Sequence, residues 1–272
     1  MNNKKWLSFP YIIWMAAFII IPLLMIIYYG FTSQEGSFSL RNLTLIADPI
    51  NLKALWLSLR LSVISTVLCL ILAYPVALIL HTMKLKSNSF VVMIFILPMW
   101  MNFLLRTLAW QNILEKTGVI NTFLNLLHLP KINIINTPTA IIFGMVYNFL
   151  PFMILPIYNI LIKISDDITN AARDLGANSI QTFIKIILPL SLPGVISGIT
   201  MVFVPSLTTF VISEILGGSK VVLIGNVIEQ QFKTINNWHT GSGLSLVLMI
   251  FILISMAVLA KYDKEEEGKR VW

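Results

Sequence analysis

The chain has 272 residues, of which 57% are hydrophobic and 11% are charged, and its mean hydropathy is +0.84. This composition excludes an ordinary soluble domain and is typical of an integral membrane protein. The formal net charge of +7 would suggest a nucleic-acid partner in a soluble protein. Here the basic residues are spread over loops and span ends, so they indicate contact with the lipid bilayer and no nucleic acid.

Six apolar runs are each long enough to cross about 30 Å of hydrocarbon at about 1.5 Å per residue. The first run follows Lys4 and Lys5 but is too long for the core of a signal peptide, so we interpret it as a span. Prolines in the fourth and fifth runs predict kinked helices that pack inside a bundle. The fold class predicted is all-α integral membrane, with six transmembrane helices at about residues 9–31, 57–80, 90–110, 138–160, 187–212 and 243–261.

An even number of spans places both termini on the same side of the membrane. More of the 19 Lys and Arg residues fall on that side than on the other, which predicts that both termini are cytoplasmic. We divide the chain into an N-terminal span with the first outer loop (1–56), a five-span core (57–261) and a cytoplasmic tail (262–272). Two outer loops, 118–128 and 221–232, have the apolar spacing of short amphipathic helices.

A polar segment of about two helical turns lies between the fourth and fifth runs. Ser165 can cap a short helix whose first turn contains Asp166 and Asp167, where acidic side chains favour the helix dipole. Gly176 can end this helix in a left-handed conformation. This pattern suits insertion into a groove of another protein, and it also fits an interfacial helix that packs on its own bundle. The apolar face of the helical wheel contains Ile168, Ala171, Ala172 and Leu175.

The segment Asn170–Ala177, with the later Leu188-Pro189, resembles the signature loop of the permease subunits of binding-protein-dependent ABC importers. That loop docks on the ATPase. The resemblance implies a type I ABC importer permease architecture in which residues about 165–178 form a cytoplasmic coupling helix. Asn170 stands where the family pattern has a glutamate, so the carboxylate that could form a salt bridge with the ATPase is absent. The matching positions are Ala171, Ala172, Asp174, Leu175 and Gly176.

Further matches narrow the resemblance to polyamine importers. Residues 98–102, 150–153 and, most specifically, 216–218 with 223–228 resemble the first of the two permeases of the spermidine/putrescine importer. The resemblance runs from about Trp56 to Ala260. It implies a multi-pass subunit of the bacterial cytoplasmic (inner) membrane that forms half of a pathway for polyamine uptake. The implied partners are a second permease, two ATPase subunits and an extracellular or periplasmic polyamine-binding protein.

A polyamine pathway requires carboxylates for the ammonium groups and aromatic faces for ammonium and methylene groups. Glu214 lies at the outer end of the fifth predicted span, where its carboxylate could face the substrate or simply reach the lipid headgroups. Trp100, Asn102 and Tyr147 are further candidates for the pathway. We expect Arg106, near another outer span end, to extend to the interface, because a cationic pathway would repel cations.

No phosphate-binding loop of the GxxxxGK[ST] type is present, so ATP and Mg are expected on the separate ATPase, with no cofactor bound by this chain. His81, His128 and His239 are far apart in sequence, and neither a metal site nor a catalytic residue is predicted. One alternative keeps the architecture but imports another small solute. An ATPase-independent channel or carrier would need buried acids, which spans one to four lack, and a membrane enzyme would need a catalytic cluster.

Overall fold

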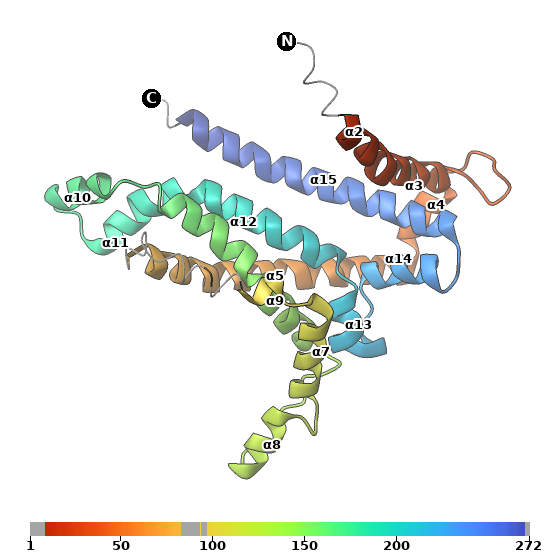
Figure 1. Ribbon diagram of the computed structural model, residues 1–272, viewed down its shortest axis with the longest axis horizontal. Helices are drawn as coiled ribbons and strands as arrows, with labels where there is room; N and C mark the ends of the chain where they lie inside the picture. The colour runs from red at the N-terminus through yellow and green to blue at the C-terminus, as the bar shows by residue number, and fades with distance from the viewer. Residues whose placement is uncertain (1–8, 83–92, 94–96, 270–272) are drawn as a thin grey trace. The chain divides into compact units, whose positions relative to one another are not determined.

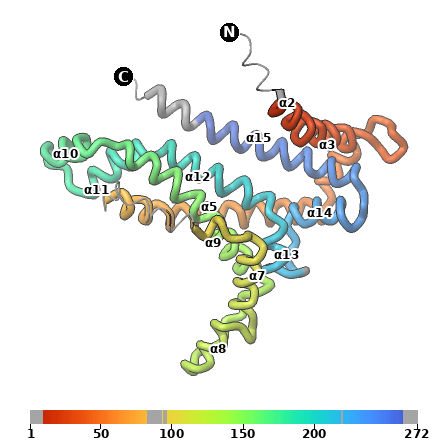
Figure 2. Tube along the Cα trace, in the orientation of Figure 1, coloured from red at the N-terminus to blue at the C-terminus, as the bar shows by residue number. Residues whose placement is uncertain are grey.

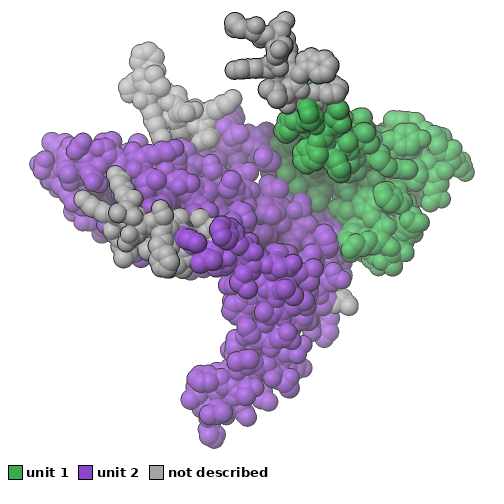
Figure 3. Space-filling model, in the orientation of Figure 1, with its two compact units in different colours: residues 1–55, 227–254 green, residues 56–226, 255–272 purple. Residues whose placement is uncertain are grey.

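The computed structural model describes residues 9–82, 93 and 97–269, apart from the side chains of Phe9, Ser219 and residues 262–269. The chain divides into two compact units, which Figure 3 colours separately. Unit 1 contains residues 1–55 and 227–254, and unit 2 contains residues 56–226 and 255–272. The described residues are helical apart from loops and an isolated antiparallel bridge between Thr32 and Phe38.

Unit 1 is built from the first long apolar helix and the beginning of the last one. The two approach each other closely at Gly30, where an added Cβ would lie 2.4 Å from Leu246 Cδ1. Its elements are α2 (Phe9–Met15), the π-helix η1 (Ala16–Ile20), α3 (Ile21–Phe31), α4 (Arg41–Thr44), η2 (Leu45–Ala47), the start of α5 (Pro49–Thr82), most of α14 (Ile224–Lys233) and the first part of α15 (Trp238–Lys269).

Unit 2 contains the main hydrophobic core, in which α9 and α12 form the most extensive helix pair and lie side by side (Figures 1 and 2). Added Cβ atoms at Gly194 and Gly198 of α12 would lie 2.8 Å from Pro156 O and 2.6 Å from Met153 Sδ of α9. Such a pair of small residues, four apart, allows two membrane helices to approach closely. Besides the rest of α5, the start of α14 and the end of α15, the elements of unit 2 are α7 (Phe103–Leu114), α8 (Val119–Leu126), α9 (Pro138–Leu161), α10 (Asp166–Asp174), α11 (Ser179–Thr182), the π-helix η4 (Phe183–Ile187), α12 (Leu188–Thr208), α13 (Val211–Gly217) and η5 (Gly218–Lys220).

Five of the six predicted spans are confirmed as helices long and apolar enough to cross a membrane. They are Pro10–Phe31, Pro49–Thr82, Pro138–Leu161, Ser179–Thr208 and Trp238–Lys261. The two predicted loop helices are confirmed as α8 and α14.

The predicted span 90–110 lies partly outside the described residues. Its described part is interrupted, because the chain leaves the helical conformation at Met101 and Asn102 before α7 begins. The Asn102 side-chain oxygen accepts hydrogen bonds from the backbone N–H groups of Leu104 and Leu105 at 2.9 and 3.2 Å. This N-cap begins a new helix inside the apolar run.

Candidate functional site

The polar segment between α9 and α12 forms the short capped helix that its sequence predicts. Ser165 Oγ accepts a hydrogen bond from the Asp167 backbone N–H at 3.2 Å. Asp166 and Asp167 occupy the first turn of α10 and Arg173 the last turn, and both placements favour the helix dipole. Gly176 has a φ of +85°, a conformation that glycine adopts at little cost. The predicted beginning and end of this helix are therefore confirmed.

The apolar face of α10 divides into a buried residue and three exposed ones. Ala172 is buried, whereas Leu175 is 90% exposed and Ile168 is 45% exposed. Ala171 is exposed as well, and so is Asp174 on the charged side. Ala172 therefore packs within its own chain. Three apolar side chains remain available for contact with another protein.

The helical conformation is interrupted between α12 and α13, at the end of the α9–α12 pair opposite to α10 (Figure 1). We call this interruption the break. At this break the Phe210 carbonyl accepts hydrogen bonds from Glu214 N–H at 2.9 Å and from Asn226 Nδ2 at 3.1 Å. Asn226 Oδ1 accepts from Leu223 N–H at 3.1 Å and lies 2.5 Å from Ser213 Oγ. We call these four residues, Phe210, Ser213, Leu223 and Asn226, the Asn226 clasp. The clasp holds α13 and the first turn of α14 to one another.

Gly225 is required where the start of α14 passes the end of α12. An added Cβ at Gly225 would lie 2.8 Å from both Thr208 O and Thr209 O. These oxygens belong to the backbone and cannot move aside without distorting the break. The conspicuous sequence Leu223–Asn226 is therefore explained by the geometry of the clasp.

Glu214 lies on α13 and not at the end of the fifth span, because that helix already ends at Thr208. Ile212 and Leu216 of α13 are fully buried, while Glu214 is exposed. The apolar side of α13 packs on α9, since the side chains of both residues lie within 3 Å of a Cβ built at Gly144. The carboxylate consequently points away from the core of unit 2.

The other three candidates for the pathway lie on different elements. Trp100, just before the break at Asn102, is 74% exposed, and Asn102 uses its side-chain oxygen to cap α7. Tyr147 of α9 is half-buried, and its ring packs edge-on against Trp110 with a centroid separation of 5.0 Å. Among the described residues, no hydrogen bond, ion pair or ring contact joins Glu214, Trp100, Asn102 and Tyr147 to one another.

Arg106 does not extend to the interface as we expected; it is only 7% exposed. Its guanidinium carbon lies 5.6 Å from the centroid of the Tyr147 ring, and its Nη1 donates to the Pro98 carbonyl. Nε has no hydrogen-bond partner among the described residues. The cation–π contact and the carbonyl together compensate for part of the cost of burying this cation. These contacts depend on the break at Asn102, and sequence reasoning missed them because it assumed one continuous span.

Comparisons with known proteins agree with this architecture. Residues 3–263 match the family described as "Binding-protein-dependent transport system inner membrane component". The chain is 36% identical over 260 residues to the spermidine/putrescine transport system permease protein PotB of Haemophilus influenzae, covering 92% of this chain and 91% of that protein. It is 38% identical over 253 residues to PotB of Escherichia coli K12, covering 90% of this chain and 92% of that protein.

A solved structure has the same fold at low sequence identity. It is the crystal structure of a bacterial ABC transporter involved in the import of the acidic polysaccharide alginate, with a TM-score of 0.77 and 17% identity. The match covers 97% of this chain and 96% of that one. The chain therefore belongs to the family of inner membrane components of binding-protein-dependent transport systems.

Proposed function

We propose that this chain is the transmembrane permease subunit of an ATP-driven importer of polyamines such as spermidine and putrescine, and that it forms half of the translocation pathway. The observation that supports this proposal most strongly is the 36% and 38% identity to two spermidine/putrescine permeases along at least nine-tenths of the chain. Alignments that cover nine-tenths of the chain include both the α10 segment and the Asn226 clasp. These two features lie at opposite ends of the α9–α12 pair.

The complete importer would contain a second permease, two ATPase subunits and a polyamine-binding protein outside the membrane. ATP and Mg would bind to the ATPase subunits, and this chain would bind no cofactor. Six spans, with the third within residues 90–110, would place both termini in the cytoplasm. A family of inner membrane components and the positive-inside bias of the sequence support this arrangement.

In this assembly α10 is the coupling helix. Ile168, Ala171 and Leu175 would enter a groove of the ATPase, where burial of their apolar surface stabilises the contact. Asp174 and Gly176 would fix the helix end, and Ala172 would hold α10 to its own chain. Because α10 packs on α11, and α11, η4 and α12 are consecutive parts of one helix from Ser179 to Thr208, a displacement of α10 has a continuous helical route to α12.

In the pathway, Glu214 offers a carboxylate to a passing ammonium group. Trp100 and Asn102 are exposed at the beginning of α7, a helix that packs against α13, and would contribute an aromatic face and an amide. Arg106 lies over one face of the Tyr147 ring, so an ammonium group reaches that face only when Arg106 moves away. This resident guanidinium would keep the aromatic face occupied in the absence of substrate.

The test is reconstitution of this chain with its partner permease, ATPase and binding protein, followed by uptake of labelled spermidine, putrescine and an unrelated solute. We expect polyamine uptake that requires ATP and the binding protein. ATP-dependent uptake of the unrelated solute alone would keep the architecture but contradict the cargo. Polyamine uptake by the permeases without the ATPase would contradict the coupling and indicate a channel or carrier.

A further inference from the structure

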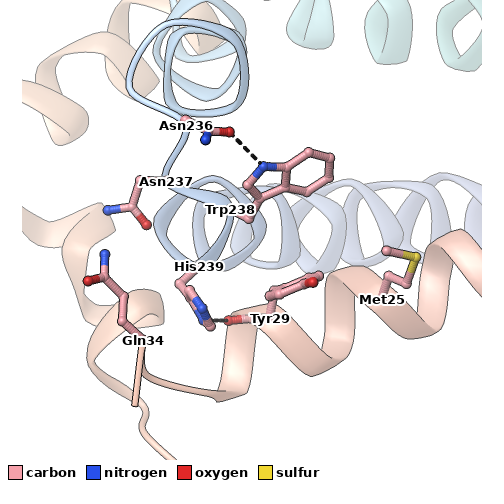
Figure 4. A pocket seen from close by; sticks show the side chains of 7 residues that line it. All are labelled: Met25, Tyr29, Gln34, Asn236, Asn237, Trp238 and His239. Atoms are coloured by element: carbon pink, nitrogen blue, oxygen red, sulfur yellow. Dashed lines mark hydrogen bonds between the residues drawn. The ribbon is translucent and has the colours of Figure 1, made fainter. Parts of the chain in front are cut away.

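Two adjoining cavities lie in unit 1 where two spans end. One is lined by Met25, Tyr29, Gln34, Asn236, Asn237, Trp238 and His239 and has a volume of about 470 Å³ (Figure 4). It is formed by the C-terminal end of α3 and the N-terminal end of α15 with the residues just before it. Because both helices are membrane spans by length and composition, these ends lie at the same membrane surface whichever way the chain is oriented.

The wall of this cavity near the loops carries uncharged hydrogen-bond donors. Asn236 Oδ1 accepts from Trp238 Nε1 at 3.0 Å, and Asn237 Oδ1 accepts from Thr240 N–H at 3.1 Å. These bonds occupy the amide oxygens, so the amide nitrogens of both residues are left to donate. Gln34 lies beside Asn237 and adds a third amide (Figure 4). This end of the cavity suits a ligand group rich in hydrogen-bond acceptors.

His239 adds a fourth polar group whose orientation is fixed. Its Nδ1 lies 2.6 Å from Thr32 O and 3.2 Å from Tyr29 O. Carbonyl oxygens only accept hydrogen bonds, so Nδ1 carries the proton and Nε2 is the ring nitrogen left for a ligand. Asn42 Nδ2 also donates to Thr32 O, at 2.8 Å, and thereby holds the end of α3 in place.

The second cavity is apolar and adjoins the first. Its volume is about 310 Å³, and its lining residues are Pro22, Met25, Ile26, Tyr29, Phe232, Trp238 and Ser242. Met25, Tyr29 and Trp238 line both cavities, so the polar end continues into an apolar slot along α3. Gly30 allows α3 to lie close to Leu246 of α15. The residues that line the slot precede Gly30 in α3 and precede Leu246 in the second segment.

We propose that the two cavities together bind one phospholipid, with the headgroup among the amides and His239 and an acyl chain in the apolar slot. We call the polar end of the first cavity, with its three amides and His239, the mouth. Phosphate and ester oxygens are hydrogen-bond acceptors that match the donors of the mouth. Trp238 and Tyr29 stand between the two parts, as aromatic residues commonly do at the level of the headgroups. A polyamine fits less well, because its short methylene spacers would bring an ammonium group into a slot that has no carboxylate among its lining residues.

The lining residues of the mouth include no Asp, Glu, Lys or Arg. Binding therefore depends on hydrogen bonds and apolar contact, and the site does not select for an anionic headgroup. A zwitterionic phospholipid such as phosphatidylethanolamine should bind as well as an anionic one. Equal binding of zwitterionic and anionic phospholipids distinguishes a specific site from the general electrostatic attraction of anionic lipid to basic loops.

The experiment uses the full chain, in its assembled importer, in vesicles of phosphatidylethanolamine and phosphatidylglycerol with a trace of photoactivatable phosphatidylethanolamine that carries a diazirine in its acyl chain. Met25→Trp fills the region shared by both cavities. Leu24→Trp places the same side chain one residue away, at a position outside both linings. We expect saturable labelling of peptides containing residues 22–26 or 238–242, at least about tenfold weaker in Met25→Trp and unchanged in Leu24→Trp.

Equal labelling of the wild type and Met25→Trp would overturn the proposal, and so would labelling that only phosphatidylglycerol competes away. A neighbouring subunit is the competing occupant, and Met25→Cys tests for it. Because the sequence has a single cysteine, which is buried, the new thiol is a specific position for cross-linking. Efficient cross-linking to another subunit would show that protein fills the slot and would also overturn the proposal.

Discussion

The two ends of the α9–α12 pair differ in how they are stabilised. The α10 end is held by local caps and by Ala172, and it leaves a nearly fully exposed leucine on its surface. The α13 end is held by the Asn226 clasp and by close contact of Gly225 with the end of α12. Both ends carry conspicuous sequence motifs. One motif leaves apolar side chains exposed, and we propose that they contact the ATPase, whereas the other maintains the internal geometry of a helix break.

The largest expected effect comes from adding a side chain at Gly225, where α14 passes the end of α12. Gly225→Val should destabilise unit 2 by about 3 kcal/mol, because the new side chain clashes with two backbone carbonyls that cannot move aside. The measurement is the yield of folded chain and its thermal unfolding in detergent. The matched change at the other end, Gly176→Val, meets no atom within 4 Å. It strains the backbone locally by at least about 1 kcal/mol, because Gly176 has a φ of +85°, and it should leave the chain folded. Equal loss of fold in both variants would remove the distinction between the two ends.

The next largest effect is expected at the α10 end, where a substitution should affect ATPase binding and leave the fold unchanged. Leu175→Asp should abolish ATPase co-purification and transport, because the aspartate would place a charge in the apolar groove proposed on the ATPase. The chain should remain folded, because Leu175 has little contact with its own chain. Leu126→Asp is the control, since Leu126 of α8 is also an exposed leucine, 75% accessible, at a site far from α10 in the fold (Figure 1). Normal ATPase binding by Leu175→Asp would contradict the groove contact.

A moderate effect is expected from the carboxylate on α13. Glu214→Gln keeps the shape of the side chain and removes its charge, so polyamine uptake should fall roughly ten- to a hundredfold, as expected for loss of about 1.5–3 kcal/mol of a charge-assisted contact. Uptake is measured over a range of polyamine concentrations, together with ATPase co-purification, which should not change.

Glu229→Gln is the control for this variant. Glu229 forms an i,i+4 ion pair of 2.8 Å with the exposed Lys233, and such surface pairs contribute little. If both glutamate variants transport normally at every concentration, Glu214 is an interfacial side chain without a role in the pathway.

The smallest effect concerns the left-handed glycine that ends α10. Gly176→Ala should cost about 1 kcal/mol locally, because alanine tolerates a positive φ poorly. The fold should be unchanged, with a modest loss of coupled ATP hydrolysis measured on the reconstituted importer. Gly176→Asn should recover part of that loss, since asparagine adopts this conformation more readily. Identical activity of all three proteins would mean that the end of α10 is not part of coupling.

Local features of the sequence predicted the helices well. The apolar runs identify five long helices, and Ser165 and Gly176 mark the ends of α10, because capping and left-handed turns depend on neighbouring residues alone. Hydropathy could not reveal the break at Asn102, because one capping residue inside an apolar run barely changes the mean hydropathy of the run. The same limit explains the wrong expectation for Arg106, whose buried contacts with Pro98 and Tyr147 exist only in the folded chain.

The fifth span and the lipid cavity illustrate the same limit at longer range. Apolar residues continue beyond Thr208, so the sequence predicted a span to residue 212, but the clasp ends the helix earlier. The cavity joins residues 22–34 to residues 232–242, and no periodicity relates segments that far apart. Sequence reasoning could identify Tyr29 and Trp238 as aromatic residues near span ends, but not as walls of one pocket.

The exposure of Leu175 has a consequence for the life of the subunit before assembly. In a lone chain the apolar face of α10 with Ile168, Ala171 and Leu175 would be uncovered, and exposed apolar patches favour aggregation and recognition by quality-control proteases. Binding of the ATPase would hide this group. If α10 is the coupling helix that we propose, the half-life of the permease in the cell should depend on the supply of the ATPase, and production of the two subunits in matched amounts would protect the permease.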